Sequence, residues 1–295
     1  MDLRLGLVGH GRWGRNIERT LLSFPDVSLT ILARSDKPAL GLDAVLIATP
    51  SATHAEIALP YIEAGVATFI EKPMCTTVAD ARHIVDAAKR SGGLVFVGHL
   101  YLHHPAFLAA LDQLPKLGAI RYVLGTGMNE NLRPHGSVLW DWLPHDLSMA
   151  WALFGHDPSE ATSWSLDGGA KPRAAISKFT FGAASVVASS SWLSPIPRRA
   201  TTIFGENGTL VFDNTAERKL TFFQRPSREP VYPPYSDELP LTCEMRAFLA
   251  AIRSGTADLA SAALGARIVS AIAAAAESIE LGGKSVKIPT ALDTR

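Results

Sequence analysis

A glycine-rich turn close to the amino terminus constrains the fold of this chain more than any other feature. The turn follows the apolar run Leu3–Val8 and precedes helical spacing of apolar residues over Arg15–Ser23. In such a strand–turn–helix unit the first glycine permits a tight turn, the second lets a pyrophosphate approach the backbone, and the third allows close helix–strand packing. The spacing predicts a dinucleotide site, although a tight turn without a ligand is the alternative. The residues expected at the phosphates are Gly9, Gly11, Arg12, Trp13 and Gly14.

Short apolar runs and helical patterns alternate through the first hundred residues. Because each run is apolar throughout, the pattern is typical of a parallel sheet with both faces covered. Only about ten residues, Arg34 to Asp43, separate the second run from the third, so the helix that normally connects parallel strands is expected to be absent or reduced to a turn. The further strands are expected at Val27–Leu32, Ala44–Ala48, Ala67–Ile70 and Leu94–Val97, and the helices at His54–Gly65 and Thr77–Ser91.

A different pattern begins near residue 118. Apolar and polar residues alternate, and two β-prone runs, Thr201–Phe204 and Thr209–Phe212, flank Asn207-Gly208, the strongest short signal of a hairpin. A long alanine-rich helix follows near the end of the sequence. We therefore predict an α/β protein with two domains: residues 1–117 around a parallel sheet, and residues 118–295 around a mostly antiparallel open sheet.

The charge of the chain is balanced, with 28 Lys and Arg against 28 Asp and Glu. This balance argues against binding to nucleic acid or to an anionic membrane. No secretion signal precedes the first strand, and the longest apolar stretches fall short of the roughly 20 residues that span a bilayer. We expect a cytoplasmic protein.

Cysteine and histidine give no evidence of a metal site. Two cysteines, Cys75 and Cys243, exclude a disulfide scaffold and a cysteine-based zinc site. His99, His103 and His104 have no acidic or thiol partner nearby in the sequence, so no metal is expected. Cys75 lies near a lysine of interest but is best interpreted as a buried structural residue.

The end of the second strand bears on the choice of cofactor. An acidic residue there would bind the ribose 2′-hydroxyl of NAD and repel a 2′-phosphate, but the sequence has Arg34 and Ser35. Both can bind a 2′-phosphate, so NADP is favoured, with NAD possible. A shift of two residues would put Asp36 at this position, and Arg34 as a solvated surface charge is the alternative.

The segment Glu71-Lys72-Pro73 follows a strand at the carboxyl edge of the parallel sheet, where ligands of such sheets bind. The proline keeps Lys72 out of a helical conformation, so that its ammonium can be directed at a ligand. Lys72 can then bind a substrate hydroxyl or donate a proton. A surface lysine beside a turn proline is the alternative.

The second candidate cluster is Asp141 with His145. If the segment is helical, this spacing puts both side chains on one face. A histidine oriented by a carboxylate suits removal of an alcohol proton as hydride leaves carbon. The alternative is that the two residues cap the helix, and Asp146 is expected to start the helix or to accept an internal hydrogen bond.

Taken together, these motifs resemble the glucose–fructose oxidoreductase/inositol dehydrogenase/rhizopine-catabolism (Gfo/Idh/MocA) family over essentially the whole chain. The resemblance rests on the glycine turn and, in family order, on Ala48-Thr49-Pro50 with His54, Glu71-Lys72-Pro73, Gly98-His99, Asp141 with His145, and Glu244, Phe248, Ser278 and Gly282.

The resemblance implies a Rossmann domain followed by an α/β domain whose open sheet often forms an oligomer interface, so a homo-dimer or homo-tetramer is expected. It also implies that Lys72 is the catalytic lysine, His145 the acid/base, and Asp141 its partner or a substrate ligand. The nicotinamide side would be lined by Thr49, Pro50, His54 and Glu71.

The sequence therefore predicts an NAD(P)-dependent oxidoreductase acting on a small carbohydrate: a sugar, a polyol or a nucleotide sugar. Leu139-Trp140-Asp141 and Pro144-His145-Asp146 resemble the branch of nucleotide-sugar 3-dehydrogenases, whereas Leu100–His104 departs from it. The alternatives are a non-catalytic dinucleotide-binding regulator and an imine or enone reductase of the same fold.

Overall fold

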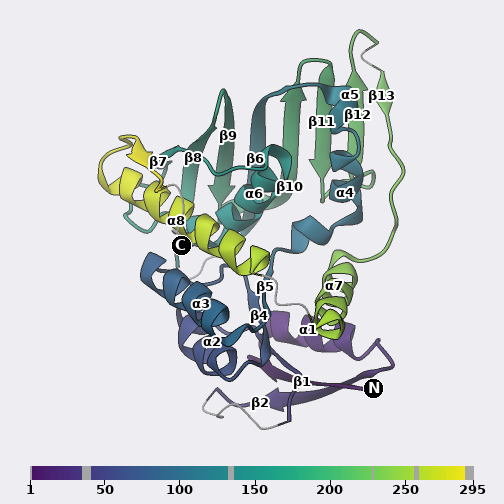
Figure 1. Ribbon diagram of the computed structural model, residues 1–295. Helices are drawn as coiled ribbons and strands as arrows, with labels where there is room; N and C mark the ends of the chain where they lie inside the picture. The colour runs from purple at the N-terminus through teal and green to yellow at the C-terminus, as the bar shows by residue number, and fades with distance from the viewer. Residues whose placement is uncertain (1, 35–40, 132–135, 228, 256–258, 290–295) are drawn as a thin grey trace. The chain divides into compact units, whose positions relative to one another are not determined.

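The computed structural model describes residues 2–34, 41–131, 136–227, 229–255 and 259–289 (Figure 1). The chain forms two compact units, and it leaves the first unit and later returns to it. The first unit holds the residues up to Leu100 together with Glu238–Val269, and the second holds Tyr101–Asp237 and the residues from Ser270 to Ala291. Our division into domains at residues 117 and 118 stays a prediction.

The first unit is built on a five-stranded parallel sheet with the order β2-β1-β3-β4-β5. Its central strand β3 is fully buried, as its apolar sequence predicts, and the α/β fold class is confirmed. The order reverses at β1, which lies between β2 and β3, and ligands of such sheets bind beyond the carboxyl ends of the strands at this position. The strands are β1 (Leu3–Val8), β2 (Val27–Leu32), β3 (Ala44–Ile47), β4 (Ala67–Glu71) and β5 (Val95–Gly98).

Helices of the first unit begin and end at the residues that favour these positions. Thr77 caps α3 by accepting a hydrogen bond from the Asp80 N–H at 3.0 Å, and Gly92, with φ 65°, ends it. The described residues between β2 and β3 contain no helix, and residues 35–40 of this connection lie outside the described residues. The helices are α1 (Arg12–Leu21), η1 (Ser51–Thr53), α2 (His54–Glu63), α3 (Val78–Ser91) and α7 (Pro240–Ser254).

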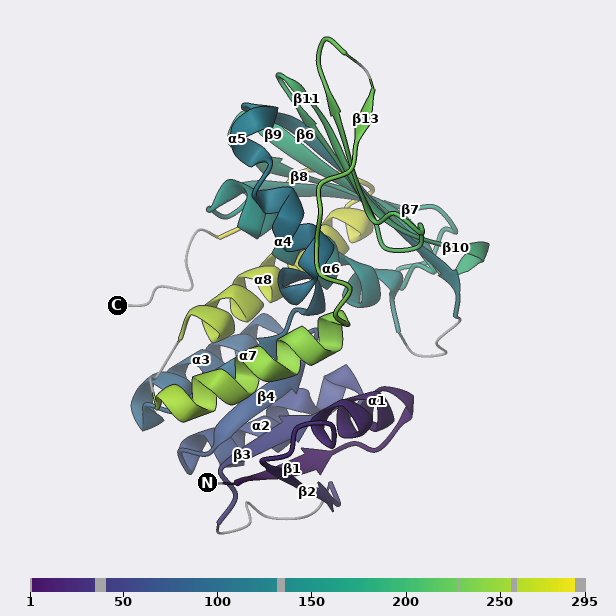
Figure 2. The same cartoon turned by 90° about the vertical axis from the view of Figure 1, so that its right-hand side faces the viewer.

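Helix α7 belongs to the first unit although it comes late in the sequence. It lies beside α1, as Figures 1 and 2 both show. Its Phe248 contacts Phe69 of β4 edge to face at 5.4 Å between ring centroids, and Phe96 of β5 at 5.5 Å. These three rings join α7 to the sheet, because buried aromatic side chains contribute large apolar areas.

The second unit contains a nine-stranded sheet with the order β13-β12-β11-β10-β6-β9-β8-β7-β14. Among the described strands of this sheet, only β6 and β9 pair in parallel, so the predicted mostly antiparallel sheet is confirmed. The predicted hairpin joins β10 to β11, with Phe204 opposite Thr209. The strands are β6 (Ile120–Glu130), β7 (Glu160–Ser165), β8 (Ala174–Phe181), β9 (Ala184–Ser191), β10 (Leu193–Gly205), β11 (Gly208–Asp213), β12 (Leu220–Gln224), β13 (Pro230–Val231) and β14 (Val286–Lys287).

Helix α6 (Val138–Phe154) packs on one face of this sheet, against β6, β8 and β9. Ser137 caps it by accepting from the Leu139 N–H, and Gly155 ends it with a positive φ. The shorter helices of the unit are η2 (Leu100–His103), α4 (Pro105–Leu111) and α5 (Leu114–Leu117).

Helix α8 (Ala260–Glu280) is the one helix among the described residues with the length and apolar composition of a membrane span. Within its most apolar stretch, 67% of the residues are buried inside the protein. A helix in the core of a globular protein shows similar burial. Leu264, Ile268 and Ile272 lie on one side of this helix and are all buried.

Candidate functional site

The glycine turn joins β1 to α1 with the geometry that the spacing predicts. A Cβ atom on Gly9, which has φ +100°, would lie 2.6 Å from the backbone of Ala48, and one on Gly14 would lie 2.0 Å from the Gly9 carbonyl oxygen. A side chain at either position would therefore push strands or helix apart. Gly11 is different, because nothing lies within 4 Å of the position of its absent Cβ.

The start of α1 fits a pyrophosphate. Gly11 is the N-cap residue, and as a glycine it offers the first turn no side-chain cap. The first turn also contains no acidic residue. Free N–H groups, an open approach over Gly11 and the positive end of the helix dipole are what an anionic ligand requires.

A buried carboxyl connects the glycine turn to the candidate lysine. Glu71, the last residue of β4, accepts a hydrogen bond from the indole Nε1–H of Trp13 and another from the Lys72 backbone N–H at 3.2 Å. Burial raises the pKa of Glu71 above its ordinary value, while the Trp13 donor and the nearby positive charge of Lys72 lower it in part. Glu71 thus holds the start of α1 and the backbone of Lys72 in a fixed relation.

A second carboxyl, Glu244 on α7, is fully buried near the first. Burial, and then the charge of Glu71, raise the pKa of Glu244 well above its ordinary value. Neither carboxyl oxygen of Glu244 has a hydrogen-bond partner among the described residues. Two N–H groups donate to Glu71 and none to Glu244, so Glu71 is the member of the pair that ionises first and Glu244 is the one that keeps its proton. Glu244 is part of the family resemblance, but the sequence pattern alone predicts no role for it.

His54 connects two loops at the same edge of the sheet. Its Nδ1 lies 2.9 Å from the Pro73 carbonyl oxygen and its Nε2 lies 2.8 Å from the Thr49 carbonyl oxygen. Burial lowers the pKa of His54, so the ring is neutral and its single N–H donates to one of these carbonyls. Thr49 also accepts from the Thr53 hydroxyl at 2.9 Å, and Pro50 comes before η1.

The candidate cofactor residues of the first unit therefore lie at the carboxyl ends of adjacent strands. Arg34 lies beyond the end of β2, is exposed, and forms an ion pair of 2.8 Å with Glu56. Ser35 and the alternative acidic residue Asp36 lie outside the described residues. Lys72, whose peptide bond to Pro73 is cis, also belongs to this unit.

Asp141 and His145 lie in the second unit within α6, Asp141 in its first turn and His145 one turn further on. Both are buried, and their spacing puts them on one face as predicted. The alternative that they cap the helix is wrong, because the helix begins at Val138 after Ser137. The expectation that Asp146 starts the helix is wrong for the same reason: Pro144 lies inside the helix and does not mark its first turn.

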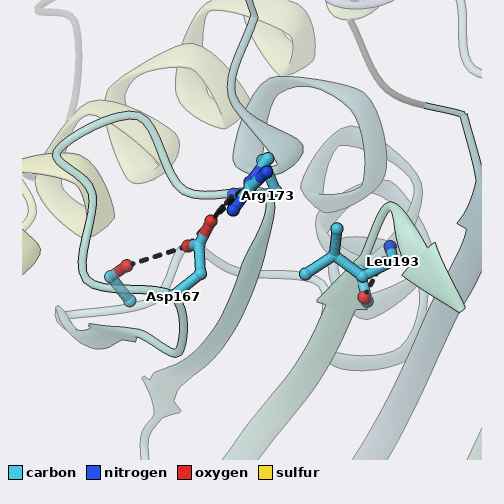
Figure 3. Close-up of polar contacts among 5 residues, drawn as sticks. Asp167, Arg173 and Leu193 are labelled. Carbon is cyan, nitrogen blue, oxygen red and sulfur yellow. Dashed lines mark hydrogen bonds and ion pairs between the residues drawn. The ribbon is translucent and has the colours of Figure 1, made fainter.

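Asp141 is oriented by a side chain from the bend between β9 and β10. It accepts a hydrogen bond from Trp192 Nε1–H at 2.9 Å, and the Trp192 backbone N–H donates to the Arg173 carbonyl at 2.8 Å. Arg173 in turn is fixed by Asp167, which accepts from its Nε–H at 2.8 Å (Figure 3). This series of contacts sets the position of the Asp141 carboxylate on α6.

His145 borders a small cavity of about 20 Å³ within the second unit. Tyr101 packs edge to face on its imidazole at 4.8 Å between ring centroids. Asp146 lines the same cavity, and burial raises the pKa of its carboxyl to about 7. The sequence did not reveal Tyr101 or the position of Asp146, because both depend on contacts between α6 and segments distant in sequence.

His104 and Cys75 have structural surroundings. His104 caps α4 by accepting from the Ala106 N–H at 3.1 Å, and its Nε2 lies 2.9 Å from the Asn214 side-chain oxygen. No group of three or more metal-binding side chains occurs among the described residues. Burial raises the pKa of Cys75 to about 12, which makes a thiolate nucleophile unfavourable there.

Comparisons with known proteins agree with this architecture. The model of an oxidoreductase family with an NAD-binding Rossmann fold matches residues 24–99. The chain is 25% identical over 192 residues to inositol 2-dehydrogenase of Rhizobium meliloti, covering 55% of this chain and 58% of that protein. It is 28% identical over 182 residues to UDP-N-acetylglucosamine 3-dehydrogenase of Acidithiobacillus ferrooxidans, covering 54% and 56%. The chain thus matches somewhat more than half the length of these curated relatives.

A solved structure gives a match over almost the whole chain. An oxidoreductase from Magnetospirillum magnetotacticum MS-1 is 33% identical, superposes with a TM-score of 0.83, and the match covers 93% of this chain and 99% of that one. Together with the glycine turn, the Glu71-Lys72-Pro73 segment and the Asp141–His145 pair, this similarity leads to one assignment. The chain belongs to the Gfo/Idh/MocA family of oxidoreductases.

Proposed function

We propose that the protein is an NAD(P)-dependent oxidoreductase that acts on a hydroxyl or carbonyl group of a sugar, a polyol or a nucleotide sugar. The observation that carries this proposal is the double hydrogen bonding of Glu71 to Trp13 in the glycine turn and to the backbone of Lys72. These hydrogen bonds connect the glycine turn, which fits a pyrophosphate, to Lys72, the lysine that is predicted to be catalytic. Relatives named for inositol and for a UDP-sugar support the substrate class.

In this proposal a bound nicotinamide supplies or accepts the hydride. The Lys72 ammonium donates a hydrogen bond to the reacting oxygen of the substrate. In the oxidation direction His145 takes the hydroxyl proton while the carbon–hydrogen bond breaks and the carbon–oxygen bond becomes double. Asp141, held by Trp192, stabilises the resulting imidazolium. In the reduction direction His145 returns that proton to the oxygen.

The test is the Lys72→Met variant, with Lys89→Met on α3 as the matched control in the same unit. We expect Lys72→Met to lose turnover by a factor of about 10² or more, since the positioned donor is gone, while nucleotide binding measured by fluorescence persists. The substrate panel includes inositols, aldoses, UDP-sugars, a cyclic imine and an enone. Turnover that is unchanged in Lys72→Met would refute the role of Lys72.

The same panel separates the proposal from its alternatives. Nucleotide binding without turnover of any compound would favour a non-catalytic regulator. Turnover of the imine or the enone alone would identify a reductase of another substrate class.

We further propose that NADP(H) binds more tightly than NAD(H). Arg34 at the end of β2 is a guanidinium able to bind a 2′-phosphate by charge-assisted hydrogen bonds. Both side chains of its ion pair with Glu56 are exposed to solvent. Replacing this ion pair with a contact to a phosphate therefore costs little free energy. Dissociation constants for NADPH and NADH, measured by fluorescence on the wild type and on Arg34→Ala, test this proposal. Tighter binding of NADH by the wild type would overturn it.

A further inference from the structure

One cationic side chain in the second unit has no role in the function proposed above. Arg199 of β10 borders the same small cavity as His145 and Asp146. It is half-buried, whereas its neighbour Arg198 is exposed, and alternate residues of a strand point to opposite faces. Arg199 is thus turned toward α6 and the histidine.

The position of the Arg199 guanidinium is fixed by the surrounding residues. Its central carbon lies 4.8 Å from the centroid of the Trp142 ring, a cation–π arrangement. Gly127 of β6 is opposite Arg199 in the strand register. A Cβ atom on Gly127 would lie 2.6 Å from the Trp142 ring, so the absence of a side chain there makes room for the indole against the sheet. The arginine therefore lies against a flat support and needs little further ordering to bind a ligand.

The charge of Arg199 is not neutralised within the part of the chain that the structure describes. No carboxylate of the described residues lies within 4.0 Å of it, whereas Arg121 and Arg173 of the same unit form ion pairs with Glu206 and Asp167. Asp146 lines the same cavity, but burial keeps its carboxyl protonated up to a pKa of about 7. A half-buried guanidinium without a counter-charge is costly, and a bound anion would offset that cost.

We propose that Arg199 binds a carboxylate or phosphate group of the substrate, which makes the substrate an acidic sugar or polyol derivative. This inference rests on the proposed function and narrows its substrate class. The cavity has room for about one oxygen atom, so one oxygen of the anion enters it and the rest of the substrate lies outside. Tyr101, at the same cavity, is a second hydrogen-bond donor, and the Asp146 carboxyl is a third at a pH below its pKa of about 7.

The test measures binding without cofactor and without turnover. Inorganic phosphate and D-glucuronate are titrated by calorimetry into the wild-type protein, Arg199→Met, Arg199→Lys and the matched control Arg198→Met, with D-glucose as the neutral comparison. We expect Arg199→Met to weaken binding of the anion by about 10-fold or more, since a hydrogen bond between charged groups is lost. Arg198→Met is expected to bind the anion as tightly as the wild type does. Arg199→Lys is expected to have an affinity between those of the wild type and Arg199→Met.

The outcomes distinguish a phosphate from a carboxylate ligand. They also distinguish failure of the anion-binding inference from failure of the proposed oxidoreductase activity. Binding of phosphate alone indicates a phosphorylated substrate, and binding of glucuronate alone indicates a sugar acid. Equal binding by the wild type and Arg199→Met, no binding of either anion by the wild type, or an equal Arg199 dependence for D-glucose would overturn the inference. Arg199-dependent anion binding in a protein that turns over no compound of the panel would instead count against the proposed oxidoreductase activity.

Discussion

Each of the two units contains a buried acidic side chain next to a candidate catalytic residue, and the two acids differ in what surrounds them. Burial raises the pKa of both Glu71 and Asp146. Glu71 receives two N–H donors, which stabilise its ionised form, whereas burial is the single cause of the shift at Asp146. The pKa of each acid is raised to about 7, so the two reach a similar value by different routes: burial opposed by hydrogen-bond donors at Glu71, and burial alone at Asp146. The degree of burial alone does not reveal which role an acid has.

The largest expected effect is on the pH dependence of stability in Asp146→Asn. The folded state holds the Asp146 proton up to a pKa of about 7, above the ordinary 3.8, so the wild type loses stability as the pH rises through this window and stays constant above it. The total loss is on the order of 4 kcal/mol. The asparagine variant lacks this titration and is expected to be more stable than the wild type at pH 8 and no more stable at pH 3.5.

Urea unfolding of both proteins at a series of pH values checks this expectation. Asp112→Asn, at an exposed acid of the same unit, is the control. Parallel pH profiles for the wild type and Asp146→Asn would mean that Asp146 ionises as an ordinary carboxyl, and the contrast with Glu71 would disappear.

The second expected effect is a loss of stability in Glu71→Gln. The amide group of glutamine would turn a donor toward the Trp13 indole N–H or the Lys72 backbone N–H, and one buried donor would lose its acceptor. We expect destabilisation by about 1–3 kcal/mol at neutral pH together with weaker nucleotide binding. Asp146→Asn is the comparison, because burial is the single cause of the pKa shift at Asp146 and no comparable N–H donor would lose its acceptor there. A Glu71→Gln variant as stable as the wild type would show that the two hydrogen bonds add nothing to the fold.

The smallest expected effect is that of Trp13→Phe, which removes one of the two donors to Glu71. The loss of one hydrogen bond is expected to cost about 1 kcal/mol of stability and to raise the pKa of Glu71 further, since one group that stabilises the carboxylate is gone. Thermal unfolding and the pH dependence of nucleotide binding measure the two effects. If the pKa of Glu71 does not change in Trp13→Phe, burial alone sets the pKa of Glu71, as it does that of Asp146.

The local elements could be predicted from the sequence because their signals are local. Strand β2 occupies the predicted Val27–Leu32, and the Asn207-Gly208 turn joins β10 to β11 as expected. The expectation that Asp146 starts α6 is wrong, because the helix begins at Val138 after the cap at Ser137. Among the site residues, Glu71 could be found from its place at the end of a strand.

The contacts that give the site its electrostatics could not be found in this way. Glu244 approaches Glu71 from a helix much later in the sequence, and Arg199 meets Trp142 only because β10 pairs with β6 opposite Gly127. No spacing rule connects residues so far apart. Whether a buried acid keeps its proton depends on such neighbours, and a single sequence does not reveal them.

The return of α7 to the first unit has a consequence for synthesis on the ribosome. Phe248 supplies one of the three rings that connect α7 to the sheet of strands β1 to β5. A nascent chain that has emerged only as far as residue 237 contains every strand of that sheet but leaves Phe69 and Phe96 without this cover. The nucleotide-binding unit is thus completed late in translation, after the whole second sheet except β14 has been made.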